Sequence, residues 1–190
     1  MLTQTTLNNI HFLGLIMADS RLMDPDVVAE LRAADSELDN LIVWLDEQTP
    51  RPGLQDLGKR LANLPIDVAG LRAHIASNQD VYCRNVIARN DDYEVVAILW
   101  TPGQDTPIHD HSGSDCAFVI LDGLSTETIY ELNQNGRAIP VSKRIYQPGE
   151  VCAADEPDIH RISNDTESEL LNLHVYTPPL GGFRIFEGAE

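Results

Sequence analysis

Three histidines form the pattern in this sequence that is best suited to chemistry. His109 and His111 are separated by one residue, and His160 follows farther along the chain. On a β-strand both imidazoles of the first pair would point to one side, with Asp110 on the other. Two imidazoles so placed can bind one ion, and His160 would add a third ligand. The alternative is a pair of incidental histidines on a surface strand.

The residues around these histidines resemble the two-part signature of the cupin superfamily. The first part of that signature is kept at every spacing by Gly103, His109, His111, position 116 and Gly123. The second part is matched by His160 and Asn164, and only loosely by Pro148 and Gly149. The resemblance implies a mainly β fold, a cupin (jelly-roll type) β-barrel. In that fold the two motifs face each other, and the three histidines bind one transition-metal ion.

Position 116 departs from the general cupin pattern, because Cys116 stands where most cupins have a glutamate ligand. One interpretation is a thiolate ligand, since cysteine binds iron, zinc and copper. The other is a site of three histidines with no carboxylate. Neutral ligands would leave the ion its full positive charge and about three open positions, by analogy with facial-triad iron enzymes. Such a site suits anionic chelating substrates together with O2.

A narrower resemblance, to the cysteine dioxygenase family, covers roughly residues 36–187 and is strongest from Tyr82 to Pro179. It is carried in order by residues 82–85, 100–103, 109–116, 121–123 with Glu127, 160–164 and 173–179. Several separated motifs in the right order are more specific than any one of them. The resemblance implies Fe(II) held by His109, His111 and His160. It also implies oxidation of a thiol to a sulfinate by both atoms of O2.

The same resemblance implies roles for further residues. Arg84 matches the family arginine that binds the substrate carboxylate, and Tyr82 matches a tyrosine beside it. Cys116 and Tyr176 match a pair that forms a thioether crosslink in the eukaryotic-type enzymes. His174 matches the histidine that hydrogen-bonds the tyrosine hydroxyl.

Each of these roles is physically reasonable beside a plainer structural interpretation. On a strand Tyr82 and Arg84 would share a face. An arginine can hold a carboxylate through paired charge-assisted hydrogen bonds, although a salt bridge would use it equally well. His174 and Tyr176 would likewise share a face, or they could be core residues with satisfied polar groups. Cys116 could be an ordinary buried thiol.

One residue departs from the cysteine dioxygenase pattern. Family members commonly have a serine two residues before the histidine, whereas this chain has Asn172. An asparagine can donate or accept a hydrogen bond, so it can still orient His174. The tautomer of His174 therefore stays open, and a plain strand residue bonded to a neighbour is the other interpretation of Asn172.

Three functions follow as hypotheses. The first is a cysteine dioxygenase-like oxidoreductase of cysteine catabolism, which converts L-cysteine to cysteine sulfinate. The second is the same chemistry on another small thiol carboxylate such as 3-mercaptopropionate. Dioxygenases of that substrate typically lack the arginine and the crosslink cysteine, so Arg84 and Cys116 favour cysteine. The third is a non-catalytic metal-binding cupin, because cupin barrels host many functions.

The amino-acid composition limits the classes of partner that the chain is expected to bind. The chain of 190 residues carries 13 basic and 30 acidic side chains, a net charge of −17, which disfavours nucleic acid and anionic membrane surfaces. The three cysteines are too few and odd in number for a disulfide framework, so a cytoplasmic setting is expected. The apolar run at 10–18, interrupted by Gly14, is too short to span a bilayer and is a poor signal peptide. A monomer is compatible with the sequence, which does not decide the oligomeric state.

The elements that would position these residues change character near residue 80. Residues 1–80 are expected to form a helical region that packs on the barrel, and residues 81–190 the barrel with its metal site. Helices are predicted to begin at Asp24-Pro25 and at Ser36, with a third at 54–64 and a fourth at 68–75. Residues 1–22 fit either a helix or an extended arm.

Beyond residue 80, short runs of β-branched and aromatic residues alternate with turn residues. The predicted strands are 81–88, 93–101, 106–111, 117–122, 124–132, 139–146, 151–154, 160–164, 170–177 and 183–186. Asp122-Gly123 and Asn135-Gly136 suit tight turns. Pro140 indicates that its strand starts late or lies at a sheet edge. Many short strands at close spacing favour a sandwich or barrel over βαβ units.

Overall fold

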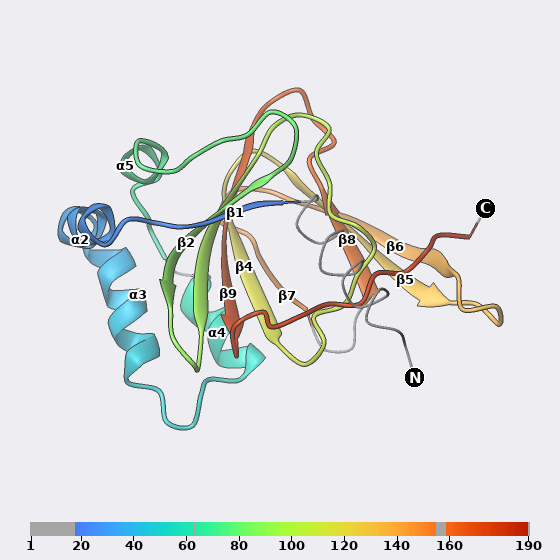
Figure 1. Cartoon of the computed structure of the whole chain (residues 1–190), viewed down its shortest axis with the longest axis horizontal. Coiled ribbons are helices and arrows are strands. Elements are labelled where there is room, and N and C mark those ends of the chain that lie inside the picture. Colours follow the sequence, from blue (N-terminus) through green and yellow to red (C-terminus); the bar gives the residue numbers. More distant parts are fainter. Residues whose placement is uncertain (1–17, 63, 155–158, 190) are drawn as a thin grey trace, which may run out of the picture.

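A computed structural model describes residues 18–62, 64–154 and 159–189 of the chain, and these residues form two β-sheets with helices on one side (Figure 1). The larger sheet holds, in spatial order, β1 (Asp19–Leu22), β2 (Cys83–Arg89), β3 (Glu94–Trp100), β9 (Leu170–Thr177), β4 (Asp115–Asp122) and β7 (Val151–Ala154). The smaller holds β6 (Ala138–Tyr146), β5 (Ser125–Leu132) and β8 (Ile159–Ser163). All pairings within these sheets are antiparallel except that of β1 with β2. The mainly β, jelly-roll cupin fold is confirmed.

Among residues 18–62 and 64–82, four helices precede β2, as predicted. They are α2 (Pro25–Ala34), α3 (Ser36–Asp46), α4 (Leu54–Leu61) and α5 (Val68–Arg72). The carboxylate of Asp24 accepts the backbone N–H of Asp26 at the start of α2, and Asp35 does the same for two N–H groups of α3. Two of the four end earlier than expected, since α4 stops at Leu61 and α5 at Arg72.

The two faces of the larger sheet meet different surroundings. Alternate side chains of β3, β4 and β9 pack with the helices in one apolar core, which includes Leu38, Leu41, Leu57, Ala97, Val119 and Leu173. The side chains between them line a cavity and include Cys116, His174 and Tyr176, joined there by Arg84 of β2. Strand alternation therefore gives the sheet a structural face and a face that lines a cavity.

Two predicted strands are wrong. Residues 106–111 and 183–186 form no regular strand and contribute isolated bridges instead, of His109 with His160 and with Ile185. Pro107 has no N–H to donate to a ladder, which disfavours a continuous strand through this segment. The chain at 105–111 instead crosses toward the smaller sheet and pairs with it one residue at a time.

The turn predictions are confirmed at Gly123 and Gly136, which have φ angles of 80° and 73°. A Cβ atom at Gly123 would lie 2.4 Å from the carbonyl oxygen of Glu169, so this position also needs glycine for space. Pro140 lies on the edge strand β6, opposite a register shift in β5, as its missing N–H requires.

The choice between a helix and an extended arm for residues 1–22 is decided only at residues 19–22, which are extended and form β1. The apolar run at 10–18 lies, apart from Ala18, outside the described residues. The division at residue 80 stays a prediction, and β1 places part of the first region in the larger sheet. Within the described ranges, none of the helices combines the length and the apolar character that crossing a membrane would take.

Candidate metal centre

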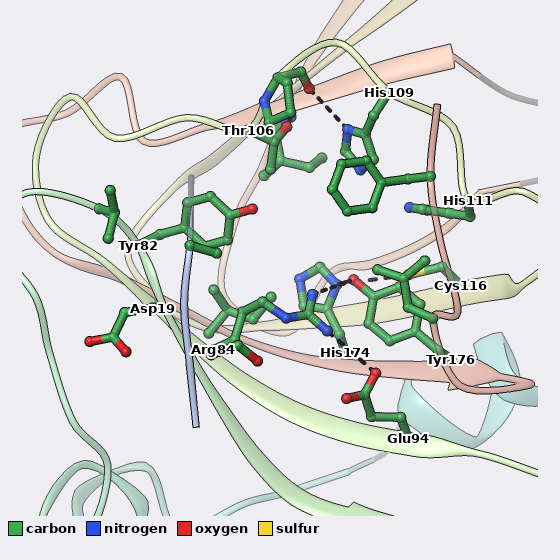
Figure 2. Close-up of a pocket in the computed structure, with 18 of the residues that line it drawn as sticks. Asp19, Tyr82, Arg84, Glu94, Thr106, His109, His111, Cys116, His174 and Tyr176 are labelled. Atoms are coloured by element: carbon green, nitrogen blue, oxygen red, sulfur yellow. Dashed lines mark hydrogen bonds and ion pairs between the residues drawn. The ribbon is translucent and has the colours of Figure 1, made fainter. Parts of the chain in front are cut away.

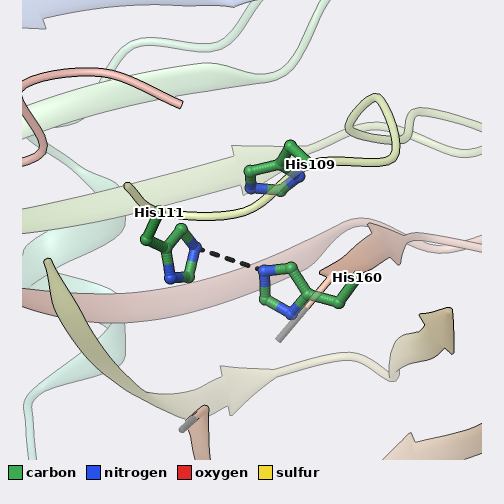
Figure 3. A group of neighbouring side chains, drawn as sticks. All are labelled: His109, His111 and His160. Carbon is green, nitrogen blue, oxygen red and sulfur yellow. Dashed lines mark hydrogen bonds between the residues drawn. The ribbon is translucent and has the colours of Figure 1, made fainter. Parts of the chain in front are cut away.

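Three histidine side chains converge between the two sheets (Figure 3). One ligand nitrogen each from His109, His111 and His160 lies within 4.8 Å of the other two, and all three residues are buried. The Nε2 atoms of His111 and His160 are 3.2 Å apart. The geometry therefore brings together the residues that the spacing of the sequence suggested, although 106–111 is no strand.

The main chain joins two of the ligands directly. The backbone N–H of His109 donates to the carbonyl of His160 at 2.9 Å, and the N–H of His160 returns a bond of 2.8 Å to His109. This reciprocal pair links the loop at 105–111 to strand β8. These backbone bonds hold the two residues side by side, whatever their imidazoles bind.

Hydrogen bonds also set which ring nitrogens face the centre. Nδ1 of His109 lies 2.9 Å from the carbonyl oxygen of Pro107, and Nδ1 of His160 lies 2.8 Å from a carboxylate oxygen of Glu127. Both oxygens can only accept, so each Nδ1 carries a proton and donates it. In both rings Nε2 is left with its lone pair for an ion.

Glu127 is a functional residue whose role the sequence did not reveal, although it belongs to one of the resemblance motifs. Its buried carboxylate accepts from His160, from the hydroxyl of Tyr146 at 2.9 Å and from the thiol of Cys152 at 3.3 Å. Burial acts to raise the pKa of Glu127, but the hydrogen bonds outweigh it and the pKa is lowered. Glu127 is thus a charged acceptor that fixes the ring of His160.

Burial keeps the rings of His109 and His111 neutral. Loss of solvent, followed by the neighbouring His160, lowers the pKa of His109 to about 3 and that of His111 to about 2. Neutral imidazole is the form that binds a metal. The group that can hold an ion contains no carboxylate and does not include Cys116. Three imidazole nitrogen donors fit a divalent transition metal such as iron or zinc.

A cavity of about 830 Å³ opens beside this centre (Figure 2). The three histidines line one part of it, and the larger sheet contributes the opposite wall with Arg84, His174 and Tyr176. Figure 2 shows Arg84 between Tyr82 and Tyr176, with Glu94 next to it. The residues assigned to the metal and to the substrate therefore share one space.

Arg84 provides the positive charge in the cavity wall formed by the larger sheet. Its Nη1 lies 3.4 Å from the hydroxyl oxygen of Tyr176, and its carbon Cζ lies 5.3 Å from the centre of the same ring. Tyr82, directly before β2, stacks on Trp100 with ring centroids 4.3 Å apart. Burial acts to lower the pKa of Arg84, but Tyr176 and Glu94 more than offset it, so the guanidinium stays charged.

Glu94 is a cavity residue that sequence reasoning missed. Its carboxylate is 2% exposed and lies 3.3 Å from Nη2 of Arg84 and 3.6 Å from Nη1 of Arg89. A glutamate inside the apolar run at 93–101 is the signal that could have identified it, because a buried carboxylate needs a cation. Glu94 partly neutralises the cation that is expected to bind substrate.

Cys116, His174 and Tyr176 form a compact cluster on the larger sheet. Cys116 on β4 is the register partner of Tyr176 on β9. Nδ1 of His174 lies 3.2 Å from the Tyr176 oxygen and 3.7 Å from the Cys116 sulfur. Burial lowers the pKa of His174 well below its usual value and raises that of Tyr176, so both groups are neutral.

Comparison with protein families gives one extended match. The family model described as "Cysteine dioxygenase type I" matches residues 61–189, which include every site residue named above. Among curated proteins, cysteine dioxygenase type 1 of Bos taurus is 30% identical over 112 residues, and that of Danio rerio 30% over 114 residues. Each alignment covers 56% of both chains, so the chain spans about half the length of the curated relatives it matches.

Solved structures resemble the chain more distantly. An uncharacterized conserved protein with a double-stranded beta-helix domain from Klebsiella pneumoniae is 19% identical, with a TM-score of 0.49 over 62% of this chain and 88% of that one. A cupin superfamily protein from Desulfitobacterium hafniense is 16% identical, with a TM-score of 0.46 over 57% and 87%. These likenesses concern the fold alone.

Proposed function

The chain belongs to the cysteine dioxygenase type I family, and from that premise we propose that it is a thiol dioxygenase that converts L-cysteine to cysteine sulfinate with O2. The observation that carries the proposal is the presence of Arg84 in the same cavity as three metal-competent histidines. The carboxylate of such a substrate would bind Arg84, and its thiolate would bind the ion held by the three histidines.

In this proposal His109, His111 and His160 hold Fe(II) through nitrogens whose orientation is already set. When bound, that ion supplies the site for the substrate thiolate and the activation of O2. Glu127 keeps the ring of His160 in place and raises its basicity. The three ligand residues are buried, and the cavity beside them gives a substrate access to the ion.

Arg84 binds the substrate carboxylate in the proposed complex. Its guanidinium remains charged at any pH of interest and offers several N–H donors in a rigid plane. Tyr82, stacked on Trp100, lies beside it in the same cavity. A carboxylate held at Arg84 would direct the thiol end of a short substrate toward the histidines.

Tyr176 holds a proton at its hydroxyl throughout, because burial raises its pKa. It lies against both Arg84 and His174, and its ring is edge-on to His111 with centroids 5.7 Å apart. The hydroxyl is therefore suited to hydrogen-bond the reacting end of the substrate. The organic chemistry belongs to the ion, whereas the protein orients the substrate.

Cys116 and Tyr176 are proposed to form the thioether crosslink, since they are cross-strand partners near one imidazole nitrogen. The reaction joins the sulfur to a ring carbon and removes the thiol hydrogen and one ring hydrogen, with O2 taking up the two electrons. Intact mass of the iron-loaded, O2-exposed chain should fall by two hydrogen atoms. Tyr176→Phe should show no such loss, and an unchanged mass in the parent chain would contradict the crosslink.

The test of the main proposal is anaerobic loading with Fe(II), followed by cysteine and O2. We expect O2 consumption matched by formation of cysteine sulfinate. Arg84→Gln should lower kcat/KM for cysteine about ten- to a hundredfold, because it removes a charge-assisted bond to the carboxylate. Cysteamine, which has no carboxylate, is the control substrate and should react equally with both proteins.

Comparison of kcat/KM for cysteine and 3-mercaptopropionate then decides between the two thiol carboxylates. Preference for 3-mercaptopropionate would overturn cysteine as the substrate and keep the chemistry. Zinc in the purified protein with no turnover after iron loading would overturn the dioxygenase itself and favour a non-catalytic cupin.

A further inference from the structure

A β-bulge in β2 brings a second arginine to the cavity. Where β2 pairs with β3, the register shifts between Val86 and Ala88. Val86 packs in the apolar cluster on the cavity side of the sheet, whereas Ile87 and Ala88 both pack in the core shared with the helices. Alternation resumes one residue late, so Arg89 lines the cavity together with Arg84. In a regular strand two residues five positions apart would lie on opposite faces.

Glu94 stands between these two arginines. Arg89 and Glu94 are register partners on β2 and β3. One carboxylate oxygen, Oε2, lies 3.3 Å from Nη2 of Arg84 and accepts a hydrogen bond from it (Figure 2). The other oxygen, Oε1, lies 3.6 Å from Nη1 of Arg89 in an ion pair. The single carboxylate is therefore shared by two cations, one oxygen to each.

The charges along the cavity show why the second cation matters. Among the described residues, the charged side chains that line it are Asp19, Arg84, Arg89 and Glu94. Asp19 forms an ion pair with Arg21, which leaves the other three. Arg84 and Glu94 alone would be a neutral pair, and a substrate carboxylate beside them would be a second negative charge in a buried space. Arg89 supplies the positive charge that balances it.

We propose that Arg89 is a positioning residue that takes over the carboxylate of Glu94 when a substrate carboxylate binds Arg84. In the free cavity Glu94 is shared between the two arginines. In the occupied cavity it pairs with Arg89 alone, and Nη2 of Arg84 donates to the substrate instead. The inference rests on the proposed function for the role of Arg84, and it adds the residue that makes Arg84 available.

A plainer role for Arg89 makes a different prediction. Its side chain is 51% exposed, so its charge could attract any anion to the cavity without help from Glu94. That attraction would persist if Glu94 were uncharged. A role in exchanging the carboxylate acts only through Glu94, so that removing the charge of Glu94 should abolish the effect of Arg89. The two residues are then energetically coupled, which a double-mutant cycle measures.

The first measurement is the Kd of L-cysteine for the Fe(II)-loaded protein, determined by calorimetry without O2. Arg89→Gln should raise Kd about two- to fivefold, the range expected for a half-exposed ion pair. Arg89→Lys keeps the positive charge and should restore Kd to near the parent value. Arg137→Gln is the matched control, because Arg137 is 50% exposed, pairs with Glu187 and does not line the cavity. It should leave Kd unchanged.

The double variant provides the decisive comparison. Arg89→Gln combined with Glu94→Gln should bind cysteine as tightly as Glu94→Gln alone. An equal rise in Kd on loss of Arg89 in both backgrounds would show that Arg89 acts by its own charge, and it would overturn the inference. So would an unchanged Kd in Arg89→Gln itself.

Steady-state kinetics with O2 give the second measurement. In Arg89→Gln we expect KM for cysteine to rise while kcat stays the same, and cysteamine, which has no carboxylate, to react as with the parent protein. A fall in kcat, or an equal response with cysteamine, would contradict an action through the substrate carboxylate. Coupled Kd values in a protein that does not oxidise cysteine would sink the proposed function alone. Independent Kd values in a protein that does oxidise it would sink this inference alone.

Discussion

Strand β9 has two faces that follow different rules. Toward the helices it presents Leu171, Leu173 and Val175, which are apolar and fully buried. Toward the cavity it presents Asn172, His174 and Tyr176, which are equally buried but polar. The same backbone ladder supports both sets, and strand alternation alone separates them.

This difference predicts which face of the strand determines stability and which determines activity. Side chains on the helix face are held by volume and contact, so a change there should affect the free energy of unfolding. Side chains on the cavity face are held by specific hydrogen-bond partners, so a change there should affect binding and chemistry. The predictions below, from the largest expected effect to the smallest, test that separation.

His160→Ala should have the largest effect, on the cavity side. It removes one of three ligands and leaves the carboxylate of Glu127 without its strongest donor, so we expect loss of stoichiometric iron and of cysteine oxidation. Metal analysis and O2 consumption measure both. His74→Ala, which changes an exposed histidine hydrogen-bonded to Gly70, is the matched control and should bind iron normally.

Leu173→Ala tests the helix face. The residue is fully buried in the core shared with the helices, so we expect a loss of about 2–5 kcal/mol in the free energy of unfolding. Chemical denaturation measures this loss. Iron content per folded chain and kcat/KM for cysteine should be preserved, and a fall in either would break the separation of the two faces.

Glu127→Gln tests a cavity residue that acts through a ligand. The amide oxygen can still accept from His160, but the charge is lost, so we expect iron affinity to fall about 10- to 100-fold. Competition with a chromogenic chelator measures the affinity. Glu131→Gln alters an exposed carboxylate on the same strand and should have no effect. An equal loss in both variants would point to net charge alone.

Glu94→Gln should have the smallest effect. It removes the negative charge 3.3 Å from Nη2 of Arg84, so KM for cysteine should fall about two- to tenfold as the guanidinium becomes more available to the substrate carboxylate. Steady-state kinetics measure it, with cysteamine as the substrate that should not respond. A rise in KM would mean that Glu94 chiefly orients Arg84.

Sequence reasoning reached the fold and the residues around the centre through different kinds of signal. Helix starts and most strands are written in local patterns of caps, proline and alternation. The three histidines are identified as metal ligands by their spacing and by the family resemblance. They lie close together although residues 106–111 form no strand. The wrong strand prediction at 106–111 did not affect the predicted site. The backbone hydrogen bonds between His109 and His160 hold this loop in place without a regular strand.

The remaining site features depend on contacts between strands. The carboxylates of Glu94 and Glu127 face partners on neighbouring strands, Arg84 on β2 and His160 on β8. Nothing in the residues flanking either glutamate shows which cation or ring will face it. The hydrogen bond from the indole of Trp100 on β3 to the side-chain oxygen of Asn172 depends in the same way on a contact between strands.

The reciprocal backbone bonds between His109 and His160 also bear on how readily such a centre can be redesigned. Any residue except proline can make these two bonds, so the positions of the two ligands are encoded in the main chain and not in the imidazoles. An engineer could therefore exchange either side chain and expect the backbone pairing to persist, but a shorter carboxylate or thiol would place its donor atom nearer the main chain than the imidazole nitrogen. The backbone pairing thus determines where these two residues stand, whatever side chains they carry.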